Sequence, residues 1–273
     1  MVSLRGKTAN MKKSIGLLAI SLATILSSCN KESNVAQVPD PVTNYDLYDL
    51  SGWDSSDPTE GGVFGALQMI ERNDSGISIV GNFAYGFVVD SIALNADSVM
   101  EANFLNVGSV HLNDVKLNKN NENIYAYSYS EGKNIGIPLN FSSVWEIGDL
   151  QDTSFYISQL SGQPDVPIVS HETNFSLIQD FEAVINDKVN GATNFSLLVK
   201  SPSGLKYYTE FANSGLDSVA ISVSSDTLQA MGRGEYSFFV SAYVSSEQET
   251  LPEIEKNVAF RNQSVYRGTF VFK

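Results

Sequence analysis

Short apolar or alternating runs of about four to eight residues, separated by Gly, Asn, Asp and Ser, recur along most of the chain. Alternation with a period of two is typical of β-strands, because successive side chains point to opposite faces of a sheet. In the first half this pattern predicts strands at 63–70, 77–80, 83–89, 99–105, 109–112, 124–129, 135–141, 144–147 and 155–160. Turn-forming runs such as 73–76 and 131–134 lie between them.

The same pattern continues in the second half and predicts strands at 194–200, 206–211, 219–223, 236–244, 258–261 and 266–272. Closely spaced short strands favour a β-sandwich over alternating strands and helices. The segment 161–167 contains a Gly and two Pro, which marks it as a boundary. The sequence therefore predicts an all-β fold with two tandem β-sandwich domains, at 45–163 and 164–273.

Two segments test this interpretation. Apolar residues between 174 and 190 fit either a helix or two strands at 175–178 and 181–185, and we favour strands because a second sandwich needs a first hairpin there. The run at 225–232 predicts a helix of one or two turns, with Ser225 or Asp226 as its N-cap.

The N-terminal segment has a different pattern. Lys12 and Lys13 precede a continuous apolar run at 15–26, which is too short to span a bilayer but suits the core of a signal peptide. The run ends in Leu-Ser-Ser before Cys29, the only Cys of the chain. This ending resembles the bacterial lipobox, in which the Cys is acylated and becomes the first mature residue.

The lipobox resemblance implies a signal peptide at 1–28, with Met11 as the more suitable start, and a lipid-bearing tether at 29–44. The tether has no apolar periodicity and contains two prolines. Its Lys31-Glu32 pair resembles the surface-export signal of Bacteroidota lipoproteins, although an ordinary polar spacer is the alternative. We expect an outer-membrane lipoprotein that is held by N-terminal acyl chains and exposed at the cell surface, with the periplasmic face as the other option.

The stretch from Leu228 to Ala242 resembles strand F of an immunoglobulin or fibronectin type III domain. In those folds a Tyr near the start of the strand bonds back to upstream backbone, which is the role implied for Tyr236. The resemblance implies that the C-terminal domain is immunoglobulin-like. The C-terminal half lacks the Cys pair and the strand-C Trp that are typical of immunoglobulin domains, since Trp145 lies in the N-terminal half.

Composition narrows the function. The chain has 273 residues, of which 42% are hydrophobic and 18% charged, as expected for a folded globular protein. A net charge of −14 argues against a nucleic-acid partner. One Cys and two His exclude a Cys/His zinc cluster and a disulfide framework, and we expect neither a metal nor a cofactor. His111 and His171 read as strand or surface residues, so we predict no catalytic residue.

Two groups are candidates for ligand binding. The first contains Trp53, Asp54 and Asp57, which form either a solvated loop or a weak ligand contact. In the second, Tyr125, Tyr127 and Tyr129 alternate with small residues, so their rings share one face of a strand. An exposed row of rings would stack against sugars, whereas the favoured alternative is that they line the inside of the sandwich.

Asp followed by Ser or Thr and then an apolar residue occurs at Ser91, Ser98, Ser218 and Thr227. The pattern resembles the general O-glycosylation site of Bacteroidota. A turn leading into a strand explains it equally well.

Together these features predict a lipid-anchored cell-envelope protein that acts as a non-catalytic binding or adhesion module for a glycan or a protein. One alternative is a fimbrial subunit that polymerises by strand addition, with 266–272 as the exchangeable strand. A second alternative is a glycoside hydrolase that uses paired carboxylates.

Overall fold

The computed structural model describes residues 61–73, 76–94, 100–127, 139, 142–148, 155–252 and 254–273. Within these residues the regular structure is β except for one helix, which confirms the all-β prediction. Several predicted features lie outside the described residues: the signal peptide, Cys29, the tether, Trp53, Asp54, Asp57, Ser98 and Tyr129.

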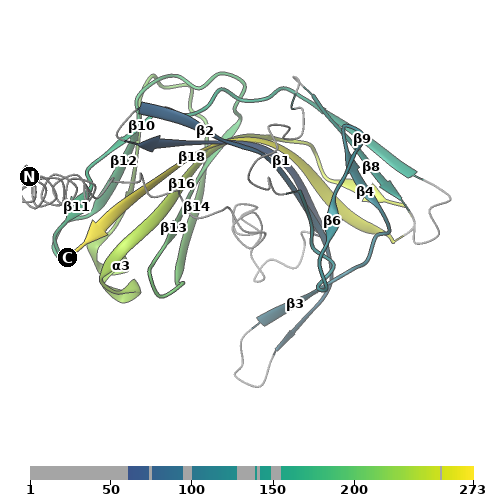
Figure 1. Ribbon diagram of the computed structural model, residues 1–273, viewed down its shortest axis with the longest axis horizontal. Coiled ribbons are helices and arrows are strands. Elements are labelled where there is room, and N and C mark those ends of the chain that lie inside the picture. Colours follow the sequence, from purple (N-terminus) through teal and green to yellow (C-terminus); the bar gives the residue numbers. More distant parts are fainter. Residues whose placement is uncertain are drawn as a thin grey trace, which may run out of the picture. The chain divides into compact units, whose positions relative to one another are not determined.

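One large sheet of 11 strands forms the centre of the fold (Figure 1). Its main path is β14 (Lys206–Ala212), β13 (Asn194–Lys200), β16 (Gly234–Ser245), β18 (Lys256–Phe272), β1 (Gly62–Asn73), β2 (Gly76–Leu94), β7 (Tyr125–Tyr127) and β6 (Asn118–Lys119). Three further strands pair off this path, namely β3 (Met100–Phe104) with β2, and β11 (Asn174–Phe175) and β17 (Glu249–Leu251) with β18.

Strand β18 joins the two halves of the chain. It pairs antiparallel with β16, from Gly234↔Phe272 to Ser245↔Arg261. On its other side it pairs parallel with β1, from Val63↔Ala259 to Glu71↔Arg267. Strands from both sides of the expected boundary at 163 and 164 therefore share one sheet, and the division into two domains stays a prediction.

The boundary segment itself is bonded to β18. The side-chain amide of Asn262 donates to the carbonyls of Leu160 and Gly162, at 3.1 and 2.9 Å. Gln163 Nε2 donates to the carbonyl of Gln263 at 2.6 Å, and Ser264 Oγ donates to the carbonyl of Pro164 at 2.6 Å. This segment is thus fixed to the sheet.

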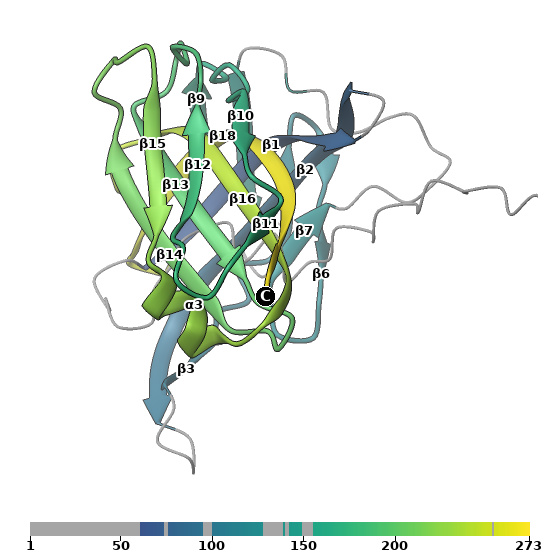
Figure 2. The same ribbon diagram turned by 90° about the vertical axis from the view of Figure 1, so that its left-hand side faces the viewer.

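A second sheet consists of β10 (Val169–His171), β12 (Phe181–Ile185) and β15 (Val219–Val223). It packs on the part of the large sheet that contains β13, β16 and β18, and Figure 2 shows the two layers. Phe181, Phe238 and Phe270 lie at the centre of the shared core, and the Phe181 and Phe270 rings stack at 4.2 Å. This half is therefore a two-layer β-sandwich, as expected.

A third sheet consists of β5 (Val115–Lys116), β4 (Val110–Leu112), β8 (Ser142–Gly148) and β9 (Phe155–Ser161). Its buried Trp145 packs against Phe64 of β1 and Phe260 of β18, with ring centroids 5.6 and 6.1 Å apart. The ring pairs belong to one continuous apolar core between this sheet and the large one.

The segment at 174–190 contains strands and no helix, and β12 has the expected bounds. The strand expected at 175–178 is wrong, because β11 ends at Phe175 and 176–180 is a turn. The expected hairpin is not formed either, since β11 pairs with β18 and β12 pairs with β10 and β15. The short helix is also confirmed as α3 (Ser225–Met231), but the expected caps Ser225 and Asp226 are wrong. Ser224 has extended backbone angles and its side chain accepts a hydrogen bond from the Thr227 N–H, so it caps the helix instead.

Two pairs of expected strands are each one strand. The segments 77–80 and 83–89 form β2, because the irregularity between them is a β-bulge opposite Met69 and Ile70 and not a turn. The segments 258–261 and 266–272 form β18, although polar residues interrupt the apolar pattern. Asn262 and Ser264 are buried there with their side chains hydrogen-bonded, so the strand continues through them.

The implied role of Tyr236 is confirmed. Its hydroxyl donates to the carbonyl of Leu228 at 3.1 Å and also contacts the carbonyl of Gly232. The side chain is buried at the start of β16 and ties that strand to the end of α3.

Two glycines admit aromatic rings between β1 and β2. Gly65 faces Tyr85, and Gly86 faces Phe64. A Cβ at Gly65 would lie 2.2 Å from the Tyr85 ring, and one at Gly86 would lie 2.3 Å from the Phe64 ring. Each glycine is therefore required by the ring on the neighbouring strand.

Candidate functional site

A pocket of about 310 Å³ lies where β5, β6 and β7 meet. Such a volume is at the lower end of the range for small-molecule sites, so it suits a small ligand or one unit of a larger one. Its walls are mainly polar and consist of Asn106, Gly108, Ser109, Lys116, Leu117, Asn118, Lys119 and Tyr125.

Tyr125 forms the inner wall of this pocket. Its side chain is 1% exposed, and the ring belongs to the core that contains Trp145. The hydroxyl accepts a hydrogen bond from the Val107 N–H at 3.0 Å. As a donor it lies 3.0 Å from Asn106 Oδ1 and 3.1 Å from the Gly108 carbonyl oxygen. Burial raises the pKa of this hydroxyl, while the bond from Val107 lowers it.

Tyr125 is thus placed as in the buried alternative, because its hydroxyl holds the 106–108 segment and its ring packs inside. Tyr127 is half-buried, and Tyr129 lies outside the described residues. Because the Tyr125 ring is buried, it is not exposed to stack against a sugar, and the three tyrosines do not form a shared stacking surface.

Asn106 stabilises the rim of the pocket through one of its two amide atoms. Its Oδ1 accepts from the Gly108 N–H at 3.2 Å as well as from Tyr125. Gly108 has a φ of 84°, a conformation that favours glycine. The Asn106 Nδ2 has no hydrogen bond to the part of the chain that the structure describes, so it remains available as a donor.

Two lysines contribute the charge of the pocket. Lys116 lies at the end of β5 and Lys119 at the end of β6, and both are exposed. Neither forms an ion pair with another described residue. The lining contains no Asp or Glu, so its charged side chains are all positive in a chain whose net charge is −14.

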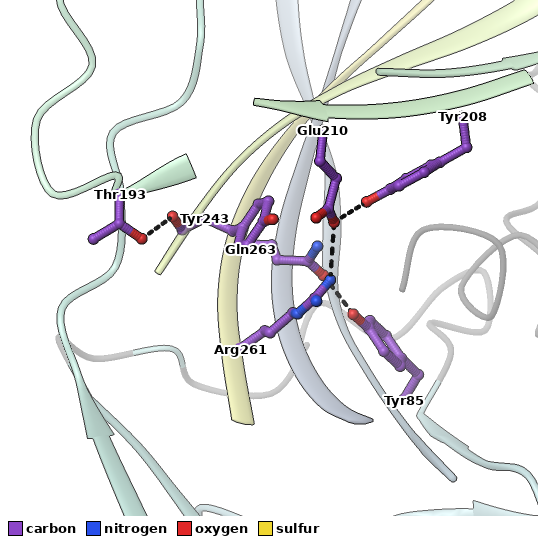
Figure 3. Close-up of polar contacts among 7 residues, drawn as sticks. All are labelled: Tyr85, Thr193, Tyr208, Glu210, Tyr243, Arg261 and Gln263. Atoms are coloured by element: carbon purple, nitrogen blue, oxygen red, sulfur yellow. Dashed lines mark hydrogen bonds and ion pairs between the residues drawn. The ribbon is translucent and has the colours of Figure 1, made fainter. Parts of the chain in front are cut away.

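A second polar cluster lies around Arg261 of β18 (Figure 3). The guanidinium lies 3.4 Å from Glu210 Oε1 and 4.9 Å from the centre of the Tyr243 ring. Tyr208 donates a hydrogen bond to the same Glu210 carboxylate, and Tyr85 donates to Gln263 Oε1 at 2.8 Å.

Within this cluster the positive charge of Arg261 is balanced by Glu210. Burial disfavours the charged guanidinium, yet the pKa of Arg261 is raised because Tyr85, Tyr243 and Glu210 lie beside it. Burial likewise raises the pKa of Tyr85 and of Tyr243 well above the usual value. Arg261 is 7% exposed and already paired with Glu210, so this cluster links β2, β14, β16 and β18 through polar contacts and is not an open binding site.

The described O-glycosylation candidates have three different settings. Ser91 is exposed within β2, where its Oγ accepts from Asn103 Nδ2 at 3.3 Å. Ser218 is exposed immediately before β15, as in a turn that leads into a strand. Thr227 is half-buried in α3, and its hydroxyl lies 2.9 Å from Ser224 Oγ.

The two histidines are separate from one another. His111 is half-buried in β4, and His171 ends β10 with its ring 4.7 Å from the Phe238 ring. Across the described ranges no group of three His, Cys, Asp or Glu residues is placed to hold a metal ion. No helix in that part of the chain is long and apolar enough to cross a membrane.

Sequence reasoning named Tyr125 but missed Asn106, Lys116 and Lys119. One signal was present, because 116–120 contains two Lys and two Asn without an acidic residue in an otherwise acidic chain. The sequence does not show that Asn106 lies beside residues 116–120, because only the fold brings both to the pocket around Tyr125.

Comparison of the sequence with protein-family models gives no match. Comparison with curated proteins gives none either.

Proposed function

We propose that this protein is a lipid-anchored binding module of the cell envelope that takes a glycan in the Tyr125 pocket. The observation that carries this proposal is the pocket, whose lining is mainly polar and whose 106–108 wall is held by the buried Tyr125 hydroxyl. Small-molecule sites are concave and orient their ligands through a few placed polar groups, and the amide and ammonium groups of this lining can bond to sugar oxygens.

The position of the pocket supports a binding role. Its walls come from short strands and turns, which are the parts of a β-rich fold that commonly carry recognition. The lining has no carboxylate, so this pocket does not support the hydrolase alternative, which needs two of them.

The proposed fimbrial alternative has a specific structural obstacle. The segment 266–272, which would have to exchange, is part of β18 and pairs with β16 along its whole length. On its other side Tyr266 and Arg267 pair with β1, and Val271 and Phe272 pair with β11. Its removal would break these pairings on both sides, whereas strand exchange normally uses a sheet edge.

The proposed anchor rests on the sequence around Cys29 and its basic and apolar leader. Two or more acyl chains would give stable membrane attachment, and the acidic chain would be repelled by an anionic surface. We place the protein in the outer membrane of a Bacteroidota-type cell, facing outward, with the periplasmic face as the alternative.

Two experiments test this function. Cells grown with labelled palmitate should yield labelled protein, and the Cys29→Ser variant should be unlabelled; unlabelled wild-type protein would overturn the anchor. The full acylated protein in detergent should bind members of an oligosaccharide panel, measured by calorimetry. Absence of heat with every neutral and acidic oligosaccharide would overturn the glycan-binding role.

A further inference from the structure

We propose that the Tyr125 pocket selects the carboxylate of an acidic sugar, such as a uronic acid, over neutral sugars. This inference rests on the proposed function, because it names the ligand class of the same pocket. It follows from which hydrogen-bonding groups of the lining are already used and which remain.

The acceptors of the inner wall are occupied. Asn106 Oδ1 receives the Gly108 N–H and lies within bonding distance of the Tyr125 hydroxyl. The Tyr125 oxygen receives the Val107 N–H, and its single proton is directed to Asn106 and Gly108. Neither side chain therefore offers the ligand a free acceptor of the kind that a sugar hydroxyl proton requires.

Several hydrogen-bond donors of the lining have no partner within the described residues. Asn106 Nδ2 has no partner in the described part of the chain, and Lys116 and Lys119 can each provide three N–H groups. Asn118 adds one amide oxygen and two N–H groups, so donors outnumber acceptors among the unbonded side-chain groups of the lining. Such a lining fits a ligand rich in acceptors, and a carboxylate accepts through both oxygens.

Charge leads to the same ligand class. Two ammonium groups line the pocket without a carboxylate beside them in the lining. The net charge of −14 disfavours the approach of anions to the chain as a whole, whereas the two ammonium groups of this pocket favour an anionic ligand locally. The exposed position of both lysines keeps their charge solvated until the ligand arrives.

The test uses full acylated protein in detergent and compares a glucuronate-containing oligosaccharide with its neutral glucose counterpart by calorimetry. We expect the acidic sugar to bind at least about tenfold more tightly, which corresponds to one charge-assisted hydrogen bond. This preference should weaken as NaCl is raised, because exposed charges are screened.

Three variants localise the effect. Lys116→Gln with Lys119→Gln should remove the preference for the acidic sugar. Asn106→Asp keeps the oxygen that accepts from Gly108 but replaces the donor with a negative oxygen, so it should abolish acidic-sugar binding without unfolding the protein. Lys188→Gln, which removes an exposed charge from a loop outside the pocket, is the control and should bind as wild type.

Each outcome has a definite meaning. Equal affinity for the two sugars, or an unchanged preference in the double lysine variant, would overturn this inference and leave the glycan-binding role intact. Absence of binding to both sugars and to the rest of the panel would overturn the function itself. Preference for a sulfated sugar over the uronate would overturn the carboxylate assignment.

Discussion

The hydroxyl of Tyr85 donates a hydrogen bond to the side-chain carbonyl of Gln263 at 2.8 Å, and both side chains are fully buried. Tyr85 lies on β2 and Gln263 on β18, with β1 between them in the sheet. The ring can cross β1 because its partner there is Gly65, which has no side chain. This contact fastens three strands from the two ends of the described chain.

Gly65→Ala should destabilise the fold. The new Cβ would lie 2.2 Å from the Tyr85 ring, so the ring must move and strain its neighbours, at a cost of about 1–3 kcal/mol. Urea unfolding followed by circular dichroism measures the change. In a Tyr85→Ala background the same substitution should cost much less, and equal costs in the two backgrounds would refute the steric explanation.

Tyr85→Phe tests the hydrogen bond separately from the ring. Loss of the hydroxyl removes one hydrogen bond to the buried Gln263 Oε1 and should lower the free energy of unfolding by about 1–3 kcal/mol. Tyr207→Phe, at a half-buried position on β14, is the matched control and should change it by less than about 0.5 kcal/mol. Similar stability of both variants would contradict a structural role for this bond.

Asn262→Ala should loosen the segment that joins the two halves. The variant loses bonds to the Leu160 and Gly162 carbonyls and the acceptor of the Ser143 hydroxyl, all at a buried position. We expect the free energy of unfolding to fall by at least about 1–3 kcal/mol, because buried polar groups are left without these bonds.

The wild type should unfold in one transition by both tryptophan fluorescence and circular dichroism, whereas separate transitions would show that the two halves of the chain unfold independently.

Alkaline pH should destabilise the protein. Burial, together with the hydrogen bond to Glu249, raises the pKa of Tyr156 from 10.0 to about 12. Between these values the folded state retains a proton that the unfolded state has lost, so the free energy of unfolding falls as pH rises from about 10 to 12. Burial also raises the pKa of Tyr85, Tyr208 and Tyr243, which acts in the same direction.

Tyr156→Phe should flatten this decline, as measured by urea unfolding at several values between pH 9 and 12. Glu249→Gln removes a negative charge beside the phenol and should shift the Tyr156 titration toward its ordinary value. A slope as steep in Tyr156→Phe as in the wild type would show that this tyrosine does not contribute.

Local patterns were sufficient to predict much of the secondary structure. The bounds of β12, β13 and β15 agree with the expected segments. In β12 and β15 one buried face imposes alternation, whereas β13 is buried on both faces and is a short, largely apolar run. Tyr236 was also identified from its local pattern, since its partners lie only a few residues upstream. These features depend on contacts that are close in sequence.

Contacts between distant segments were not predictable in the same way. The polar run at 262–264 was interpreted as a gap between two strands, because nothing local shows that Asn262 and Ser264 bond to backbone carbonyls about a hundred residues away. The candidate site was found only in part for the same reason. Tyr125 could be identified because it belongs to an aromatic row in the sequence. Asn106 and Lys116 could not, because only the fold brings Asn106 to the Tyr125 hydroxyl and Lys116 to the same pocket.

The parallel ladder between β1 and β18 sets an order of events during synthesis. The first described strand cannot complete its hydrogen bonds until the last one has been made, so neither half can finish folding while the chain is still emerging. Such a delay would suit the proposed export, because a chain that has not finished folding can still pass through a translocation channel. It also implies that a nonsense mutation shortly before residue 256 would ruin the early strands as well as the late ones.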